Sequence, residues 1–175
     1  MGQYYKPAVL GDNKKTIKKW LYSHDFGSGL KLMEHSWMEN PLVKSFENLI
    51  KDNPERVVWG GDYADKCKGS KTNVYDRCAD KNRVFRDAVN EVSVLDSRFV
   101  INHTKKVYVD KTKVPDSDGW RIHPLPLLTC EGNGRGGGDF RGDNSLVGSW
   151  ARDLISVSKT QPEGYKELIF DLVEN

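Results

Sequence analysis

The sequence predicts an α+β fold, in which residues 1–175 form a single globular domain. We expect a mixed or mainly antiparallel sheet with one clear helix, at about residues 41–51, packed on it. Three observations lead to this prediction. Short β-branched and aromatic segments alternate with turn residues, as in hairpins. One segment has the cap and the apolar spacing of a helix. The regular strand–helix alternation of a doubly wound parallel sheet is missing.

Two hairpins and three further strands account for the sheet. The turn Gly11-Asp12-Asn13 separates the first pair of strands, and His103 and Thr104 lie near the turn of the second pair. The strands are predicted at residues 4–10, 16–23, 56–60, 99–102, 106–109, 154–157 and 165–173.

The helix prediction depends on a cap and a stripe. Asn40 is a good N-cap, and Pro41 suits the first helical position. An apolar stripe then follows at helical spacing: Leu42, Phe46, Leu49 and Ile50. Shorter helical turns are expected within residues 30–37 and 73–78. Residues 120–130 contain two prolines, and we expect them to be extended but not a central strand.

Composition narrows the classes of function. The chain has 27 Lys and Arg against 25 Asp and Glu, and the net charge of +2 excludes a strongly basic nucleic-acid coat or an acidic tail. No stretch approaches the roughly 18 apolar residues of a membrane span, so we expect no membrane partner. No secretion signal is recognisable, and the three cysteines lack metal-ligand spacing. We therefore expect free thiols and a cytoplasmic location.

A glycine-rich segment, residues 131–145, is the main candidate for a binding site. Six glycines fall between Gly132 and Gly142. Glycine lets backbone N–H groups approach a ligand closely, and arginine adds forked donors for phosphate or carboxylate. The predicted ligand-binding residues of this segment are Gly132, Asn133, Gly134, Arg135, Gly136, Gly137, Gly138, Asp139 and Arg141. A tightly turned loop with solvated charges is the structural alternative.

The same segment satisfies the spacing of a dinucleotide-binding motif, but we reject that interpretation. Such a motif needs a regular strand before it and a helix at its end. Here two prolines precede it, and residues 139–144 have no helical periodicity.

A strand exit supplies the second candidate region. Trp59, Gly60, Gly61 and Asp62 stand where a buried strand ends, a position that often carries function. Arg152 would add positive charge, and Trp59 or Trp150 would stack on a base. The structural alternative is a turn in which Asp62 caps backbone N–H groups.

Catalytic chemistry is less favoured. No nucleophile motif is present, so we assign no catalytic residue, no cofactor and no metal. A metal-assisted hydrolase would draw on His24, Asp25, Glu34, His35, Asp62 and Asp139. The first hairpin carries four lysines that can contact nucleic acid, a partner that we consider but do not favour: Lys14, Lys15, Lys18 and Lys19.

Several strings resemble a group of small, uncharacterised proteins encoded by bacteria and their phages, which begin Met-Gly-Gln-Tyr-Tyr. The strings span most of the chain: residues 1–5, 23–27, 29–35, 57–65, 123–129, 131–139 and 147–153. The resemblance implies a phage or prophage accessory protein in the bacterial host cytoplasm. It implies no catalytic residue.

The expected function is therefore binding of a small anionic or nucleotide-like ligand. Such a protein would sequester a signal or inhibit a host defence factor. The first alternative is a protein-interaction module that inhibits a host protein and docks it through exposed aromatic side chains. The second is the metal-assisted hydrolase. The sequence leaves the ligand, the host target and the oligomeric state open.

Overall fold

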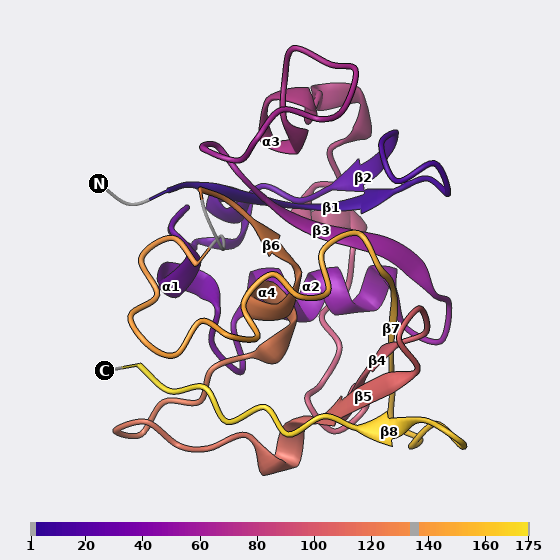
Figure 1. Cartoon of the computed structure of the whole chain (residues 1–175), viewed down its shortest axis with the longest axis vertical. Helices are drawn as coiled ribbons and strands as arrows, with labels where there is room; N and C mark the ends of the chain where they lie inside the picture. The colour runs from indigo at the N-terminus through magenta and orange to yellow at the C-terminus, as the bar shows by residue number, and fades with distance from the viewer. Residues whose placement is uncertain (1–2, 134–136, 175) are drawn as a thin grey trace.

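A single mixed sheet organises the chain in the computed structural model, which describes residues 3–133 and 137–174 (Figure 1). The strand order is β2-β1-β3-β7-β4-β5-β8, and β6 pairs with β3. The β3–β6 and β5–β8 pairs are parallel, and the others are antiparallel. The strands are β1 (Tyr5–Leu10), β2 (Ile17–Trp20), β3 (Glu55–Gly61), β4 (Phe99–Asn102), β5 (Val107–Asp110), β6 (Cys130–Glu131), β7 (Leu154–Ser158) and β8 (Lys166–Glu167).

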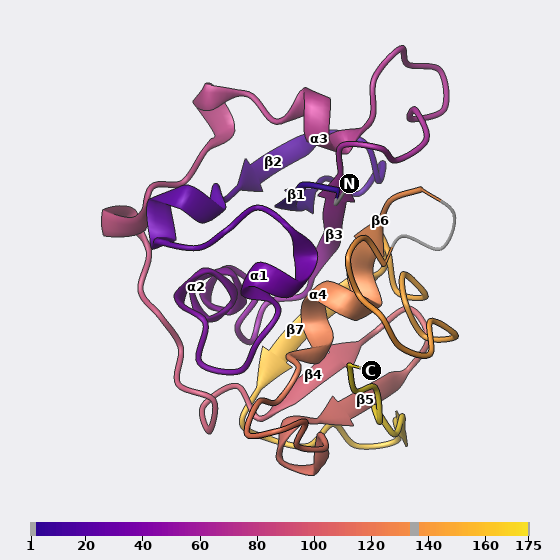
Figure 2. The same ribbon diagram turned by 90° about the vertical axis from the view of Figure 1, so that its left-hand side faces the viewer.

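The helices are short. The α-helices are α1 (Leu32–His35), α2 (Pro41–Leu49), α3 (Val74–Arg77) and α4 (Pro124–Thr129). Of these, α1, α2 and α4 lie together on one side of β1 and β3, and α3 lies on the other (Figure 1 and Figure 2). Four 3₁₀ helices lie between them: η1 (Ser23–Phe26), η2 (Asp80–Asn82), η3 (Arg86–Ala88) and η4 (Lys111–Lys113). The α+β class and the single compact domain are confirmed, and within the described residues no helix is long and apolar enough to cross a membrane.

Alternation along β3 divides the core between the two faces of the sheet. Val57 and Trp59 belong to the large cluster that includes the buried residues of α2 and α4. Val58 points to the opposite face, where it packs with Trp20 and Val74. Because successive side chains of a strand point to opposite faces, this one strand contributes to both clusters.

The predicted helix is confirmed as α2, which ends at Leu49. The Asn40 carboxamide oxygen accepts hydrogen bonds from the N–H groups of Leu42 and Val43, at 2.9 and 3.3 Å. Leu42, Val43 and Phe46 are completely buried. The cap and the stripe therefore act as the sequence predicted, and Ile50 forms the C-terminal cap.

The prediction for residues 120–130 is wrong in its second half, where α4 forms. Pro124 is the first residue of this helix, and Pro126 lies in its first turn. N–H groups of a first turn have no partner within the helix, so proline costs nothing there. The His123 ring, through Nδ1, accepts the hydrogen bond of the Leu125 N–H at 3.1 Å.

The prediction of a long last strand is also wrong. Only Lys166 and Glu167 pair as β8, beside Val107 and Tyr108 of β5. The Leu168 N–H donates to the Tyr108 carbonyl oxygen at 2.7 Å, and the pairing ends there although β5 continues to Asp110. The rest of the segment runs without regular pairing, although Phe170 and Leu172 are buried.

Candidate functional site

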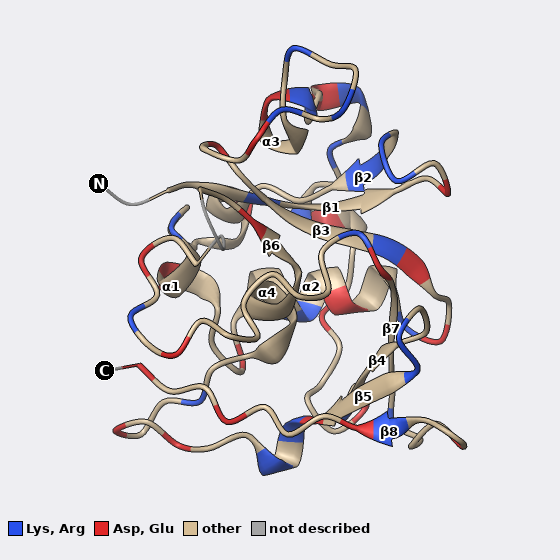
Figure 3. Cartoon of the chain, viewed as in Figure 1, with Lys and Arg blue, Asp and Glu red and all other residues tan. Residues whose placement is uncertain are grey.

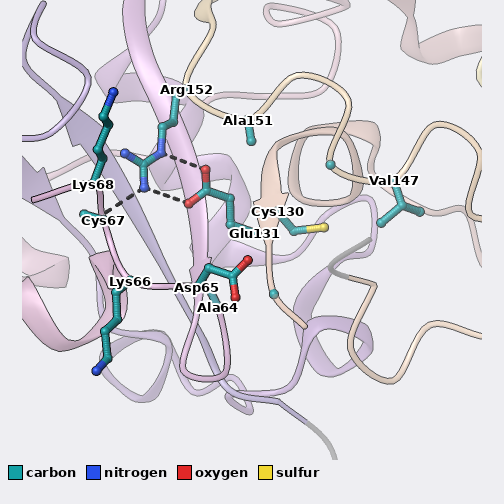
Figure 4. A pocket seen from close by; sticks show the side chains of 12 residues that line it. Ala64, Asp65, Lys66, Cys67, Lys68, Cys130, Glu131, Val147, Ala151 and Arg152 are labelled. Carbon is teal, nitrogen blue, oxygen red and sulfur yellow. Dashed lines mark hydrogen bonds and ion pairs between the residues drawn. The ribbon is translucent and has the colours of Figure 1, made fainter. Parts of the chain in front are cut away.

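A cavity of about 480 Å³ opens where three segments meet (Figure 4). We call it the Arg152 cavity. Its walls come from the loop after β3, from β6 with Gly132, and from the turn before β7; the lining residues are Ala64, Asp65, Lys66, Cys67, Lys68, Cys130, Glu131, Gly132, Val147, Gly148, Ala151 and Arg152. The parallel pairing of Gly60 with Glu131 brings the first two segments together.

An ion pair between Arg152 and Glu131 is the main polar feature of the cavity. Arg152 donates from Nε and Nη2 to the two carboxylate oxygens of Glu131, at 2.7 and 2.9 Å. The two side chains are only 20% and 27% exposed. Hydrogen bonding to Glu131 raises the pKa of Arg152 above its usual value, so the guanidinium is charged.

The guanidinium also connects two further segments to the cavity. Its Nη1 donates to the carbonyl oxygen of Lys14 at 2.9 Å, and its Nη2 lies 3.5 Å from the Cys67 sulfur. Figure 4 shows Cys67 beside Arg152, whereas the Cys130 thiol points toward Val147. All three cysteines of the chain are free. The lysine-bearing turn of the first hairpin therefore reaches the edge of this site.

The backbone fixes Arg152 in an uncommon conformation. Its φ angle is +67°, a region that residues other than glycine adopt rarely. The Arg152 N–H donates to the carbonyl oxygen of Val57 at 2.7 Å, and the Trp150 N–H donates to that of Leu128 at 2.7 Å. These bonds hold the turn between α4 and β3 and aim the guanidinium at Glu131.

The side chains that line the cavity carry a net positive charge. Its lining includes three cations, Lys66, Lys68 and Arg152, and two carboxylates, Asp65 and Glu131. Lys66 and Lys68 are exposed, and neither forms a hydrogen bond or an ion pair within the described part of the chain. Lys and Arg also gather on β2 and on the loop beside α3 (Figure 3). Because Glu131 already neutralises Arg152, the two lysines are the cations available to a ligand.

The glycine-rich segment packs on the N-terminal strand. Asn133 donates its N–H to the Gln3 side chain at 3.0 Å. A Cβ atom on Gly132 would lie 2.8 Å from the Tyr5 hydroxyl, and one on Gly138 would lie 2.9 Å from it. These glycines allow the segment to approach the Tyr5 side chain closely. Burial raises the pKa of the Tyr5 hydroxyl well above its usual value.

Other residues of this segment serve structural contacts. The Asp139 carboxylate accepts a hydrogen bond from the Met33 N–H at 2.9 Å, at the start of α1. Arg141 donates its backbone N–H to Glu174 at 3.2 Å. Gly137 lies near Phe140 and Val147. The predictions for Gly134, Arg135 and Gly136 lie outside the described residues.

The strand exit lies beside the cavity and does not line it. Trp59 is completely buried, and its Nε1–H donates to Nε2 of His35 at 2.9 Å. Gly61 packs against the Glu131 carbonyl oxygen, and Asp62 accepts a hydrogen bond from the Tyr4 N–H at 3.0 Å. Trp59 and Trp150, which is only 2% exposed, therefore have no open ring face for a base.

Of the predicted ligand-binding residues that the structure describes, Gly132 and Arg152 line the cavity. Lys66, Lys68 and Glu131 were missed. Residues 66–71 are a charged stretch without a binding motif, and nothing in the sequence indicates that β6 pairs with β3 through two residues. A two-residue parallel pairing has no periodicity from which it could be recognised.

The candidate metal ligands are separated. Asp25 accepts two hydrogen bonds from Arg83, and the Glu34 carboxylate accepts one from the Lys31 N–H. The Nδ1 atom of His35 lies 2.9 Å from the carbonyl oxygen of Gly29. In the described ranges, no three of the His, Cys, Asp and Glu side chains gather into a group that could hold a metal ion.

Comparisons with protein-family models, with curated proteins and with solved structures gave no match. They therefore add nothing to what the geometry of the chain indicates about function.

Proposed function

We propose that the protein binds a small anionic ligand, with a phosphate-bearing nucleotide as the preferred class, in the Arg152 cavity. The single observation that carries this proposal is the position of Lys66 and Lys68. Both line a cavity of about 480 Å³, and both are without an acidic partner in the described chain. A volume of this size is typical of sites for small ligands.

The Arg152–Glu131 pair would act as the fixed wall of this site. A forked guanidinium pair is geometrically specific, so it holds the cavity open in one shape. The guanidinium of Arg152 is charged but offset by Glu131, so Lys66 and Lys68 would supply the positive charge that attracts a phosphate. The backbone N–H groups of Lys66 and Lys68 add two donors that have no acceptor within the described residues.

The resemblance to proteins encoded by bacteria and their phages suggests a biological role for this binding. A small protein that holds a nucleotide tightly would remove a signal from a bacterial cytoplasm, and no catalytic residue would be required. We therefore favour sequestration of a nucleotide over its hydrolysis.

Calorimetry tests the proposal with inorganic phosphate, a nucleoside, and its mono-, di- and triphosphates. We expect a dissociation constant below 1 mM, roughly the weak end of specific binding, for at least one phosphorylated compound and none for the nucleoside. The double substitution Lys66→Gln/Lys68→Gln should weaken binding at least about tenfold, because the only unpaired cations of the lining are lost.

The matched control replaces two other exposed lysines, as Lys51→Gln/Lys159→Gln, at the opposite end of β7. This variant has the same net charge and should bind as the wild type does. Equal binding by all three proteins, or no binding of any phosphorylated compound at millimolar concentration, would remove the proposal.

A further inference from the structure

A second cavity, lined by two tryptophans, lies away from the Arg152 cavity and differs from it in charge. We call it the Trp cleft. It encloses about 480 Å³, and its lining has no cationic side chain: Glu34, Trp37, Met38, Glu39, Asn40 and Trp120. The side chain of Trp120 is 63% exposed, which is unusual for so large an apolar group.

A tight turn presents Trp120 to solvent in a fixed position. The N–H of Trp120 donates to the carbonyl oxygen of Ser117 at 2.9 Å, and the N–H of Ser117 donates back at 2.6 Å. Between them, Asp118 and Gly119 have φ angles of +51° and +86°. Two left-handed residues define a type I′ turn, for which Asp-Gly is a preferred pair. The turn therefore fixes the backbone of Trp120, and its ring lies against that of Trp37.

The two indole rings form a corner. Their centroids lie 5.9 Å apart, and their planes make an angle of 60°. Trp37 donates its Nε1–H to the carbonyl oxygen of Met33 at 2.6 Å, so its polar edge is satisfied within the protein. Backbone pairing of Trp37 with Ile122 fixes the segment of Trp37 against that of Trp120. What the corner offers to a ligand is mainly ring face.

The charge beside this corner is negative. Glu34 forms no ion pair with the described residues, and its Oε2 accepts the Lys31 N–H at 2.9 Å. Glu39 is paired with Lys44 at 2.9 Å, which offsets its charge. Asp118 lies in the turn next to Trp120, and Asp116 lies just before that turn, where its Oδ1 accepts the Gly119 N–H at 2.7 Å. The nearby guanidinium of Arg121 points away, to the carbonyl oxygens of Val114 and Lys111.

We propose that the Trp cleft binds a small organic cation that carries a quaternary ammonium group. The faces of indole rings attract cations, and tryptophan does so most strongly among aromatic side chains. The uncompensated carboxylate of Glu34 adds a complementary charge. Glu34 and the two indole rings line the same cleft, so both attractions would act on one bound cation.

The occupied hydrogen-bond groups favour an alkylated nitrogen over a primary ammonium. The Asn40 carboxamide oxygen already caps α2, and its Nδ2 donates to Ser28 at 3.1 Å. A primary ammonium has three N–H groups to satisfy, and the lining offers the Glu34 and Glu39 carboxylates as acceptors but no acceptor on the ring faces, so part of its hydration would be lost uncompensated. A quaternary ammonium has no N–H group to satisfy.

Intrinsic fluorescence provides a direct measurement. Three of the five tryptophans, Trp20, Trp59 and Trp150, are at most 3% exposed. Trp120 is the one that water reaches most. We expect choline and tetramethylammonium to change the long-wavelength part of the emission with saturation. The neutral carbon analogue of choline, 3,3-dimethylbutan-1-ol, and the primary amine ethanolamine should bind at least about tenfold more weakly.

Two variants locate the site. Trp120→Ala should lose the saturable signal, and calorimetry with choline should show at least a tenfold loss of affinity. Phe85→Ala removes another exposed ring, 49% exposed, and should leave choline binding unchanged. Because Trp120 is exposed, the urea midpoint of Trp120→Ala should stay close to that of the wild type, which separates loss of the site from unfolding.

Three results would overturn the proposal. One is binding of the neutral analogue as tightly as choline, which would show an apolar site without charge selection. Another is equal binding of ethanolamine. The last is unchanged choline binding by Trp120→Ala. None of these results bears on the Arg152 cavity, whose anionic ligands are tested separately.

Discussion

The ammonium group of Lys111 lies 2.6 Å from the carboxylate of Glu47, and both side chains are completely buried. Lys111 also contacts the Ser97 hydroxyl at 2.8 Å, and Nε2 of His123 lies 3.0 Å from the second Glu47 oxygen. Burial alone would raise the pKa of Glu47, but His123 and Lys111 more than offset it, so the pKa is lowered and the carboxylate is charged. This cluster joins α2, η4 and the start of α4.

Removing one partner of this pair should be severely destabilising. In Lys111→Met, the Glu47 charge stays in the core with His123 as its nearest partner. Breaking a buried pair in this way typically costs about 3–5 kcal/mol, a large share of the stability of a domain. Urea unfolding at pH 7 measures the loss.

The double variant Glu47→Met/Lys111→Met supplies the comparison. It removes both charges and replaces them with apolar volume, which is often close to neutral for buried pairs. We expect it to be more stable than Lys111→Met. Additive losses in the double variant would contradict the view that the uncompensated charge is what costs stability.

Stability should fall between pH 7 and pH 5 because of buried histidines. Burial lowers the pKa of His35 below its ordinary value of 6.5. Its two nitrogens are engaged by the Trp59 N–H and the Gly29 carbonyl, which suits the neutral ring. The unfolded chain therefore binds more protons near pH 6, so stability is present above about pH 6.5 and is lost as pH falls.

The variant His35→Gln checks this dependence. Glutamine keeps one donor and one acceptor but does not titrate. It should be less stable at pH 7 and show a slope smaller by up to about 1.4 kcal/mol per pH unit. Urea midpoints at pH 7, 6 and 5 give the slopes, with His24→Gln, at an exposed position of η1, as the matched substitution. A slope for His35→Gln equal to that of the wild type would refute the assignment.

The contacts of His35 and His123 show why local sequence patterns predicted the sheet better than the candidate site. Strands β1, β3, β4, β5 and β7 were predicted close to their bounds, because alternation and turn residues are local signals. The partners of His35 and His123 are Trp59 and Glu47, which are far away in sequence. Such contacts form only when the sheet and helices pack, and a single sequence carries no record of them.

The Arg152 cavity illustrates the same limit. Arg152 and Gly132 were singled out for charge and flexibility, but the third wall comes from Lys66 and Lys68, whose loop looked unremarkable. The glycine-rich segment was conspicuous, and its described glycines serve close packing on Tyr5. Glycine frequency alone does not distinguish close approach to a ligand from close approach to the protein itself.

The forked Arg152–Glu131 pair should be specific to arginine. In Arg152→Lys the charge stays, but one ammonium cannot reach Glu131, Lys14 and Cys67 together. We expect a loss of about 1–2 kcal/mol in the free energy of urea unfolding, since the pair is mostly shielded from water.

The exposed pair of Lys113 and Glu167 gives the control. Lys113→Gln should have a clearly smaller effect, because ion pairs of solvent-exposed side chains contribute little to stability. Equal losses of unfolding free energy in the two variants would show that the forked Arg152–Glu131 pair contributes no more to stability than an exposed ion pair.

Gly61 should prove essential to the position of β6. A Cβ atom on this residue would lie 2.7 Å from the backbone oxygen of Glu131 and 3.0 Å from the Tyr5 ring. Backbone cannot move aside as a flexible side chain can, so Gly61→Ala should push β6 away from β3 and cost about 1–3 kcal/mol. Gly137→Ala is the matched control, because among the described residues its Cβ would meet nothing closer than 3.6 Å, and it should change stability by less than about 0.5 kcal/mol. Thermal unfolding of both variants measures the difference, and hydrogen exchange at Cys130 and Glu131 reports whether the two strands separate. Equal stability of the two variants would show that the β3–β6 contact does not depend on glycine.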